Sequence, residues 1–208
     1  MSESPSTPAA GGIGVLGSAF NPPHLGHLAL AQEALWQLDL SEVVLMPTGD
    51  APHKRIADDP GREQRLAMTR LAAVDDPRFS VSTLEVDRKG PSYTYETLEL
   101  LAGERGDTEL VFVMGADAAV GLESWRRPER VAELARLAVA RRSGISDAEV
   151  AAVMRSLGAD QGQATMLEMP QFGVSSSSVR ERAAAGRPLR YLVPEAVARF
   201  VEEKGVYS

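Results

Sequence analysis

The chain has 208 residues, of which 44% are hydrophobic and 25% charged, the proportions of an ordinary globular protein. It contains no cysteine, which excludes a disulfide scaffold, a thiol nucleophile and a cysteine-ligated metal site. The formal net charge of −7 argues against a nucleic-acid partner, because affinity for a phosphate backbone usually needs a basic surplus. No apolar run approaches the roughly 18 residues that span a bilayer. We therefore expect a cytoplasmic protein that binds neither nucleic acid nor membrane.

Residues 1–12, MSESPSTPAAGG, have neither the basic start nor the apolar run of a signal peptide. They are rich in Pro, Ser and Gly, and we expect them to form a short disordered tail. A single domain is expected to follow, over residues 13–208.

Beyond the tail, short apolar runs alternate with segments in which aliphatic residues recur at helical spacing. The predicted strands are residues 13–17, 42–46, 79–86, 109–115, 137–140 and 165–169. The predicted helices are residues 24–40, 61–74, 94–104, 130–134, 146–157, 178–185 and 194–204.

This alternation predicts an α/β fold: a doubly wound, Rossmann-like parallel sheet with helices on both faces, in a single domain. Ligands of such sheets bind beyond the carboxyl ends of the strands, where the strand order reverses. The residues that directly follow each predicted strand are therefore the first candidates for a functional site.

The sequence GSAFNPPHLGH, residues 17–27, follows the first predicted strand. His24 and His27 lie three residues apart at a predicted helix start, so their side chains face the same way. Helix N-termini attract anions, and Gly17 and Gly26 would let a nucleotide approach the backbone closely. This arrangement predicts a phosphate site. The alternative is an ordinary turn and helix start with partly solvated histidines.

The pattern GxxFxPxHxGH of residues 17–27 resembles the signature of the nucleotidyltransferase α/β-phosphodiesterase superfamily, whose members transfer AMP or CMP to phosphate groups. Further segments resemble elements of its nicotinate mononucleotide adenylyltransferases, in the same order and over roughly residues 13–207. They are the PHK of residues 52–54, the PSYT of residues 91–94, the GAD of residues 115–117, Trp125, and the VSSSSVR of residues 174–180.

The resemblance implies a reaction in which ATP and nicotinate mononucleotide give deamido-NAD and pyrophosphate. The catalytic residues that it implies are His24, His27 and Arg180. The ATP-binding residues that it implies are Gly17, Ser18, Phe20, Gly26, Ser176 and Ser177. The mononucleotide-binding residues that it implies are His53, Lys54, Tyr93, Thr94, Gly115, Asp117 and Trp125, whose ring would stack on the pyridine.

The proposed reaction needs no general base, because a phosphate monoester with a second pKa of about 6 is mostly dianionic at pH 7. It does need groups that bring two anions together. His24, His27, Lys54 and Arg180 would supply them, with the helix N-termini expected near residues 23 and 178. Mg²⁺ is expected to arrive with the ATP phosphates, and no metal site made of protein ligands is expected.

Each element also has a purely structural interpretation. Thr94 and Asp117 could cap helices, Trp125 could be a packing residue, and Ser178 with Glu181 fits a capping box. The basic residues Lys54, Arg126 and Arg127 are by default solvated surface.

The chain departs from the usual GGTFDP of the family at two positions. Ala19 lacks the threonine hydroxyl, and the neutral Asn21 replaces an aspartate. If that hydroxyl normally meets a phosphate, Ser18 or a backbone N–H must replace it.

Other functions stay open at this point. The chain could be an adenylyltransferase for nicotinamide mononucleotide or phosphopantetheine, or a non-catalytic nucleotide sensor. A fragment of a class I aminoacyl-tRNA synthetase is disfavoured, since no KMSKS-like segment is present. A homo-oligomer is compatible with the sequence.

Overall fold

The computed structural model describes residues 11–51, 56–159 and 162–207. The predicted mononucleotide contacts of His53 and Lys54 therefore lie outside the described residues. Gly11 and Gly12, which we expected in the tail, accept hydrogen bonds from the Ser41 hydroxyl (2.8 Å) and the Ser41 N–H (3.0 Å) respectively. The domain bounds stay a prediction.

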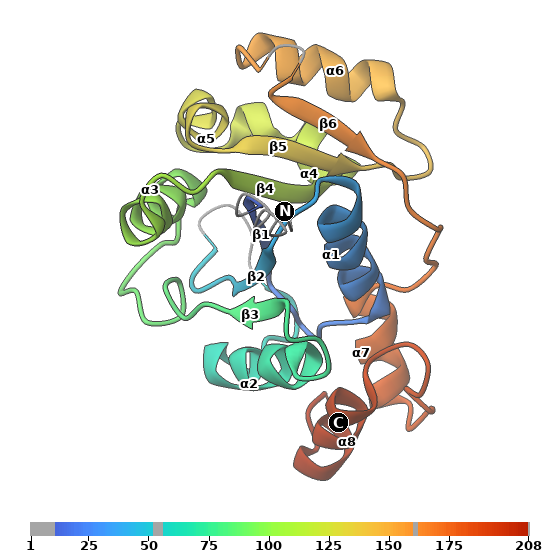
Figure 1. Cartoon of the computed structure of the whole chain (residues 1–208). Helices are drawn as coiled ribbons and strands as arrows, with labels where there is room; N and C mark the ends of the chain where they lie inside the picture. The colour runs from blue at the N-terminus through green and yellow to red at the C-terminus, as the bar shows by residue number, and fades with distance from the viewer. Residues whose placement is uncertain (1–10, 52–55, 160–161, 208) are drawn as a thin grey trace, which may run out of the picture.

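A six-stranded sheet with strand order β3-β2-β1-β4-β5-β6 forms the centre of the molecule (Figure 1). Every neighbouring pair is parallel. The strand order reverses between β1 and β4, and this confirms the predicted doubly wound, Rossmann-like fold. The strands are β1 Ile13–Ser18, β2 Glu42–Pro47, β3 Phe79–Val81, β4 Leu110–Gly115, β5 Arg136–Ala140 and β6 Ala164–Leu167.

Helices cover both faces of this sheet, as the alternating pattern predicted. Two short elements between β4 and β5, α4 and η1, were not predicted, because neither is long enough to show a helical period. The helices are α1 Leu25–Gln37, α2 Arg62–Ala73, α3 Thr94–Arg105, α4 Ala116–Val120, η1 Leu122–Ser124, α5 Pro128–Leu134, α6 Asp147–Ser156, α7 Ser176–Ala184 and α8 Glu195–Lys204.

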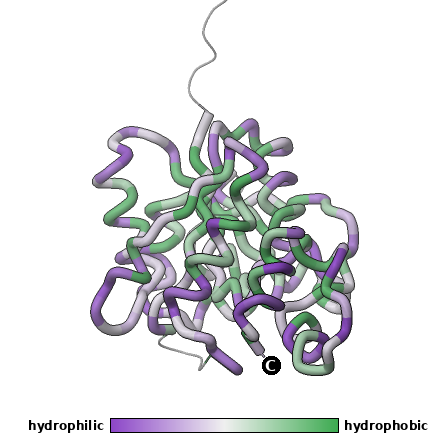
Figure 2. The backbone as a smooth tube through the Cα atoms, turned by 90° about the horizontal axis from the view of Figure 1, so that it is seen from below, coloured by the Kyte–Doolittle hydropathy of each residue, from purple (hydrophilic) through white to green (hydrophobic). Residues whose placement is uncertain are grey.

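Successive residues of each central strand enter different cores, because side chains of a strand alternate between the two faces. Val15 and Phe112 belong to the core that packs against α3, α5 and α6, whereas Leu16 and Val113 belong to the core that packs against α1. Both faces are therefore apolar, which is why the strands are continuous hydrophobic runs. In Figure 2 the hydrophobic segments accordingly gather in the middle of the molecule.

A third core joins the C-terminal part of the chain to α2. It contains Met68 of α2, Val179 of α7 and Val197 of α8. Figure 1 shows α7 and α8 beyond the β3 edge of the sheet, next to α2. This packing brings the end of the chain close to the loop that follows β1.

Several predicted boundaries are wrong. The helix expected to residue 40 ends at Gln37, the helix expected from residue 130 begins at Pro128, and the strand expected to residue 169 ends at Leu167. The strand expected over residues 79–86 ends at Val81, because Ser82 makes the last hydrogen bond to Leu45 and the chain then turns, with the Leu84 N–H donating to the Ser82 hydroxyl. The helix expected from residue 178 begins two residues earlier, at Ser176.

Candidate active site

Two adjoining cavities lie at the carboxyl end of the sheet, where β1 and β4 diverge. The larger has a volume of about 670 Å³ and the smaller about 350 Å³, and both are in the range of small-molecule sites. The residues that line both cavities are Gly17, Thr48, Ala51, Phe112 and Trp125. A ligand in one cavity therefore lies next to a ligand in the other.

The imidazoles of His24 and His27 stack on the wall of the larger cavity. Their ring centroids are 3.8 Å apart with an angle of 26° between the planes. His24 is the N-cap of α1, and His27 lies in the first turn of that helix. The expected pair of imidazoles at the first helix start is therefore present and faces one cavity.

The hydrogen bonds of His27 define its tautomer. The His24 backbone N–H donates to Nδ1 of His27 at 3.2 Å, so Nδ1 carries no proton. A neutral ring must then carry its proton on Nε2, which lies 3.2 Å from the hydroxyl oxygen of Ser18. The Nε2–H of His27 is thus a donor aimed at the end of β1.

Both imidazoles are neutral in the free protein at pH 7. Burial, and then the positive charge of Arg142, lower the pKa of His24 to about 4. Burial, and then the proximity of His24, hold the pKa of His27 well below its usual value of 6.5. We expected these rings to help neutralise two anions. In the free protein they offer hydrogen-bond donors instead, and a bound phosphate would raise both pKa values.

The residues around the imidazoles keep this geometry. A Cβ at Gly26 would lie 3.1 Å from Nδ1 of His24, so a larger residue would have to displace this ring by a few tenths of an ångström. The side chain of Phe20 is fully buried and lies edge-on to the His27 ring, with centroids 5.0 Å apart. Phe20 was expected to bind ATP, but its side chain is placed to support His27. Gly17 and Ser18 line the larger cavity as expected.

The start of α7 also lines the larger cavity, through Ser176, Ser177 and Arg180. The expected capping box of Ser178 with Glu181 is wrong, because the N-cap is Ser175, whose hydroxyl accepts the Ser178 N–H at 3.1 Å. Capping one residue before Ser176 leaves Ser176 and Ser177 in the first turn of the helix.

Arg180 connects α7 to the loop after β1. Its Nη1 donates to the Asn21 carbonyl at 3.0 Å, and its Nε forms an ion pair with Asp58 at 3.2 Å. Asp58 is largely exposed, whereas the Arg180 side chain is only 11% exposed. The guanidinium is therefore held at the cavity by the Asn21 carbonyl and by one exposed carboxylate, and a phosphate can replace the carboxylate.

The departure from the family pattern at Asn21 has a structural reason. Its buried side-chain amide donates to the Ala57 carbonyl at 2.7 Å, and its side-chain oxygen accepts the Tyr207 hydroxyl at 2.6 Å. An aspartate could not donate the first bond. The side chain thus joins the loop before α2 to the C-terminus of the chain, a role that the sequence did not suggest for Tyr207.

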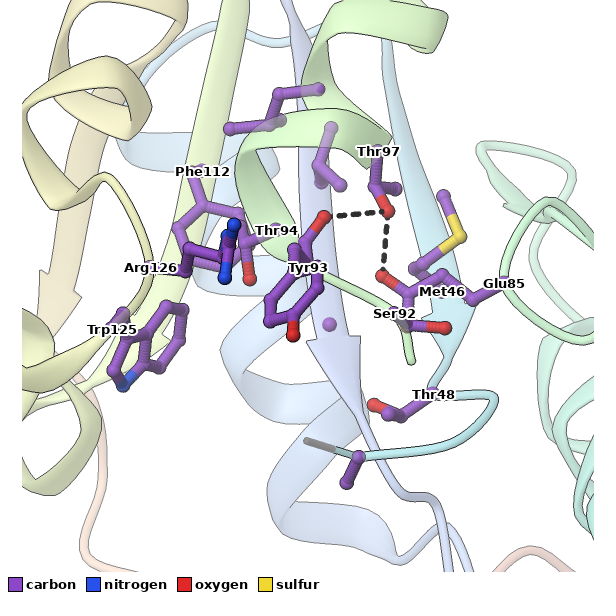
Figure 3. Close-up of a pocket in the computed structure, with 14 residues that line it drawn as sticks. Met46, Thr48, Glu85, Ser92, Tyr93, Thr94, Thr97, Phe112, Trp125 and Arg126 are labelled. Atoms are coloured by element: carbon purple, nitrogen blue, oxygen red, sulfur yellow. Dashed lines mark hydrogen bonds between the residues drawn. The ribbon is translucent and has the colours of Figure 1, made fainter. Parts of the chain in front are cut away.

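Aromatic and apolar side chains form most of the wall of the smaller cavity (Figure 3). Trp125 lies edge-on to Phe112 of β4, with centroids 6.1 Å apart, and Tyr93 lies across the cavity from it. α3 begins at Thr94, and the first N–H groups of a helix have no partner inside it. The predicted mononucleotide residues Tyr93, Thr94 and Trp125 are thus brought together here.

The backbone of Trp125 is already engaged, since its N–H donates to the Leu122 carbonyl at 2.9 Å. The start of α3 at Thr94, and not the backbone of Trp125, can therefore offer N–H groups to a ligand in this cavity.

Gly115 ends β4 and Asp117 lies in α4, and both line the larger cavity rather than the smaller one. A Cβ at Gly115 would lie 2.6 Å from a carboxylate oxygen of Asp117. Asp117 forms an ion pair with Arg142 at 3.1 Å. Both residues were expected to bind the mononucleotide. They line the same cavity as the imidazoles of His24 and His27.

Arg141 and Arg142 also line the larger cavity and were missed by the sequence reasoning. They directly follow β5, so the rule that sites lie beyond strand ends would have found them. Arg141 forms ion pairs with Asp147 and Glu168.

A family model described as cytidylyltransferase-like matches residues 15–182. The chain belongs to the cytidylyltransferase-like family. Its match to this family confirms the predicted nucleotidyltransferase class.

Curated relatives are similar in sequence to this chain over nearly its full length. A protein of Synechococcus sp. (strain JA-3-3Ab), named "Probable nicotinate-nucleotide adenylyltransferase", is 42% identical over 98% of both chains. A protein of the same name from Geobacillus thermodenitrificans is 40% identical over 95% of this chain and 87% of its own.

Solved structures show the same fold. A Plasmodium falciparum nicotinic acid mononucleotide adenylyltransferase complexed with APC superposes with a TM-score of 0.76 at 13% identity, over 95% of this chain and 97% of that chain. Its complex with NaAD has a TM-score of 0.74 at 14% identity, over 94% and 96% of the two chains. Among the described residues of this family member, no helix is long and apolar enough to cross a membrane.

Proposed function

We propose that this chain transfers the AMP moiety of ATP to nicotinate mononucleotide, giving deamido-NAD and pyrophosphate. The observation that carries the proposal is the pair of adjoining cavities. One is lined by the hydrogen-bond donors that phosphates need, and the other by aromatic rings that suit a pyridine. Relatives about 40% identical over nearly the full chain are named for this activity.

ATP would occupy the larger cavity, with its α- and β-phosphates against His24, His27 and the first turn of α7. A phosphate oxygen of the mononucleotide attacks the α-phosphorus, a new P–O bond forms, and the bond to the β-phosphate breaks. The electron pair of that bond leaves with pyrophosphate. Since the attacking oxygen is already ionised, no proton has to be removed.

The protein would act by position and by electrostatic stabilisation. The Nε2–H of His27 and the ring of His24 would donate to phosphoryl oxygens, on which negative charge develops during transfer. Arg180 would exchange its bond to Asp58 for a phosphate oxygen, and so add a full positive charge.

The donor set fits a magnesium ion that arrives with ATP. In the part of the chain that the structure describes, no group of three or more His, Cys, Asp or Glu residues could hold a metal ion. Mg²⁺ keeps several waters and needs only one or two protein ligands, so the triphosphate would supply most of its coordination. When bound, it would neutralise charge on the phosphates.

The smaller cavity argues against phosphopantetheine as the acceptor. Phosphopantetheine is a flexible, hydrogen-bonding chain with no ring that could stack on Tyr93 or Trp125, whereas a flat pyridine can stack on one of them. The amide mononucleotide would fit the same space. The predicted cytoplasmic location and homo-oligomer stay predictions.

The test is pyrophosphate release from ATP and Mg²⁺ with each acceptor in turn: nicotinate mononucleotide, nicotinamide mononucleotide and phosphopantetheine. We expect the highest kcat/KM with nicotinate mononucleotide. As a control, His24→Ala should lower turnover by about a hundredfold or more, the scale for losing one charge-stabilising donor. ATP binding without pyrophosphate release with any acceptor would favour a nucleotide sensor and refute the proposal.

A further inference from the structure

Two consecutive arginines follow Trp125, and each lies over a tyrosine ring. The guanidinium carbon of Arg126 is 5.0 Å from the centroid of Tyr93, and that of Arg127 is 5.3 Å from the centroid of Tyr95. Only Arg126 lines the smaller cavity. The two side chains therefore share charge, length and type of contact, but differ in whether they face the site.

Among the described residues, no neighbouring carboxylate neutralises the charge of Arg126. Its contacts are with Tyr93 and Tyr95, whose rings and hydroxyls hold it without cancelling its charge. In residues 11–51, 56–159 and 162–207, no carboxylate oxygen forms an ion pair with this guanidinium. Its N–H groups can therefore turn toward a ligand anion at little cost.

The opposite side of the cavity is acidic. Glu85 is only 7% exposed, lines the cavity, and accepts a hydrogen bond from the Thr97 hydroxyl at 2.9 Å. Figure 3 shows Glu85 and Arg126 on opposite sides of the space, with Tyr93 between them. An anionic group on a bound ring would be attracted to the Arg126 side and would gain no attraction from the Glu85 side.

We infer that Arg126 determines specificity between the acid and amide mononucleotides, by placing its guanidinium opposite the pyridine carboxylate of nicotinate mononucleotide. The inference rests on the proposed function. A carboxylate is an anion that only accepts hydrogen bonds, so it gains both charge attraction and N–H donors from Arg126. The nicotinamide group is neutral and gains no charge attraction.

The experiment compares Arg126→Gln with Arg127→Gln, which removes the same charge one residue away from the cavity. For each protein, kcat/KM is measured with nicotinate mononucleotide and with nicotinamide mononucleotide, and the acid-to-amide ratio is calculated. Arg126→Gln should lower the ratio about 1.5- to fivefold, the range for a solvent-accessible charge contact. Arg127→Gln should leave the ratio unchanged, and Arg126→Lys should restore part of it.

Ionic strength gives an independent measurement. Added salt should lower the acid-to-amide ratio of the unmodified enzyme and have little effect on Arg126→Gln, since salt screens solvent-accessible charge pairs. An unchanged ratio in an active Arg126→Gln variant would overturn the inference and leave the proposed function intact. An equal fall in both glutamine variants would also overturn it, because a general charge effect would explain both. Absence of pyrophosphate from the unmodified enzyme with either mononucleotide would instead overturn the proposed function.

Discussion

The substitution His27→Asn separates the two jobs that the structure gives to this imidazole. An asparagine side chain can place its oxygen near the position of Nδ1, where it accepts the His24 backbone N–H that Nδ1 accepts at 3.2 Å. It has no atom at the position of Nε2, which lies 3.2 Å from Ser18. The variant should therefore keep the helix start and lose the donor for the phosphate.

The expected magnitudes follow from these contacts. Loss of the Ser18 contact and of the edge-on contact with Phe20, 5.0 Å between centroids, should cost about 1–2 kcal/mol of stability. Loss of one donor to a developing negative charge should lower turnover about 10²–10³-fold. The large effect on turnover should thus accompany a small effect on stability.

The assay combines pyrophosphate release with urea unfolding, and His27→Ala is the matched control. Alanine also removes the acceptor for the His24 N–H, so it should be less stable than His27→Asn by a further 1–3 kcal/mol or so. Near-normal turnover of His27→Asn would refute the role of Nε2 as a phosphate donor. Equal stability of the two variants would refute the role of Nδ1 in the helix start.

Three further predictions concern pH, the loop after β1 and the pyridine site. The pKa of His24 is about 4 in the folded protein against 6.5 for the free side chain, so stability from this residue is full above pH 6.5 and is lost toward pH 4. In urea unfolding, the free energy of unfolding should be about 2 kcal/mol lower at pH 5 than at pH 7.5 because of this residue, and His24→Asn should lack this difference. Asn21→Asp removes the donor to the Ala57 carbonyl and should lower the free energy of unfolding by about 1–3 kcal/mol; a variant as stable as the parent would contradict the buried bond. Trp125→Ala should raise the KM for nicotinate mononucleotide about tenfold, the scale of one ring stacking contact, and leave the KM for ATP within about twofold; equal effects on both substrates would assign Trp125 to packing.

Local patterns were sufficient to predict residues whose role depends on their neighbours in the chain. His24 and His27 share one helix turn, and Thr94 and Gly115 lie at the ends of predicted elements. Their positions follow from helical and strand geometry alone. Arg142 could have been predicted in the same way, because it lies just beyond a correctly predicted strand.

Roles that depend on distant parts of the chain could not be predicted. The Tyr207 hydroxyl reaches the Asn21 side chain across 186 residues of sequence, and no local pattern indicates that pairing. Arg126 and Arg127 are adjacent and chemically identical, so only the path of the chain after Trp125 decides which one lines the cavity.

Sequence alone determined that six hydrophobic segments would form a parallel sheet, since a segment apolar on both faces needs helices on both sides. It also predicted several of the side chains that gather at the reversal of strand order, among them His24, His27 and Trp125. The tertiary structure decided whether the side chains of His24 and His27 are charged or neutral. Burial in the cavity wall lowers the pKa of both imidazoles and keeps them neutral, and this burial arises only when the sheet and helices have packed.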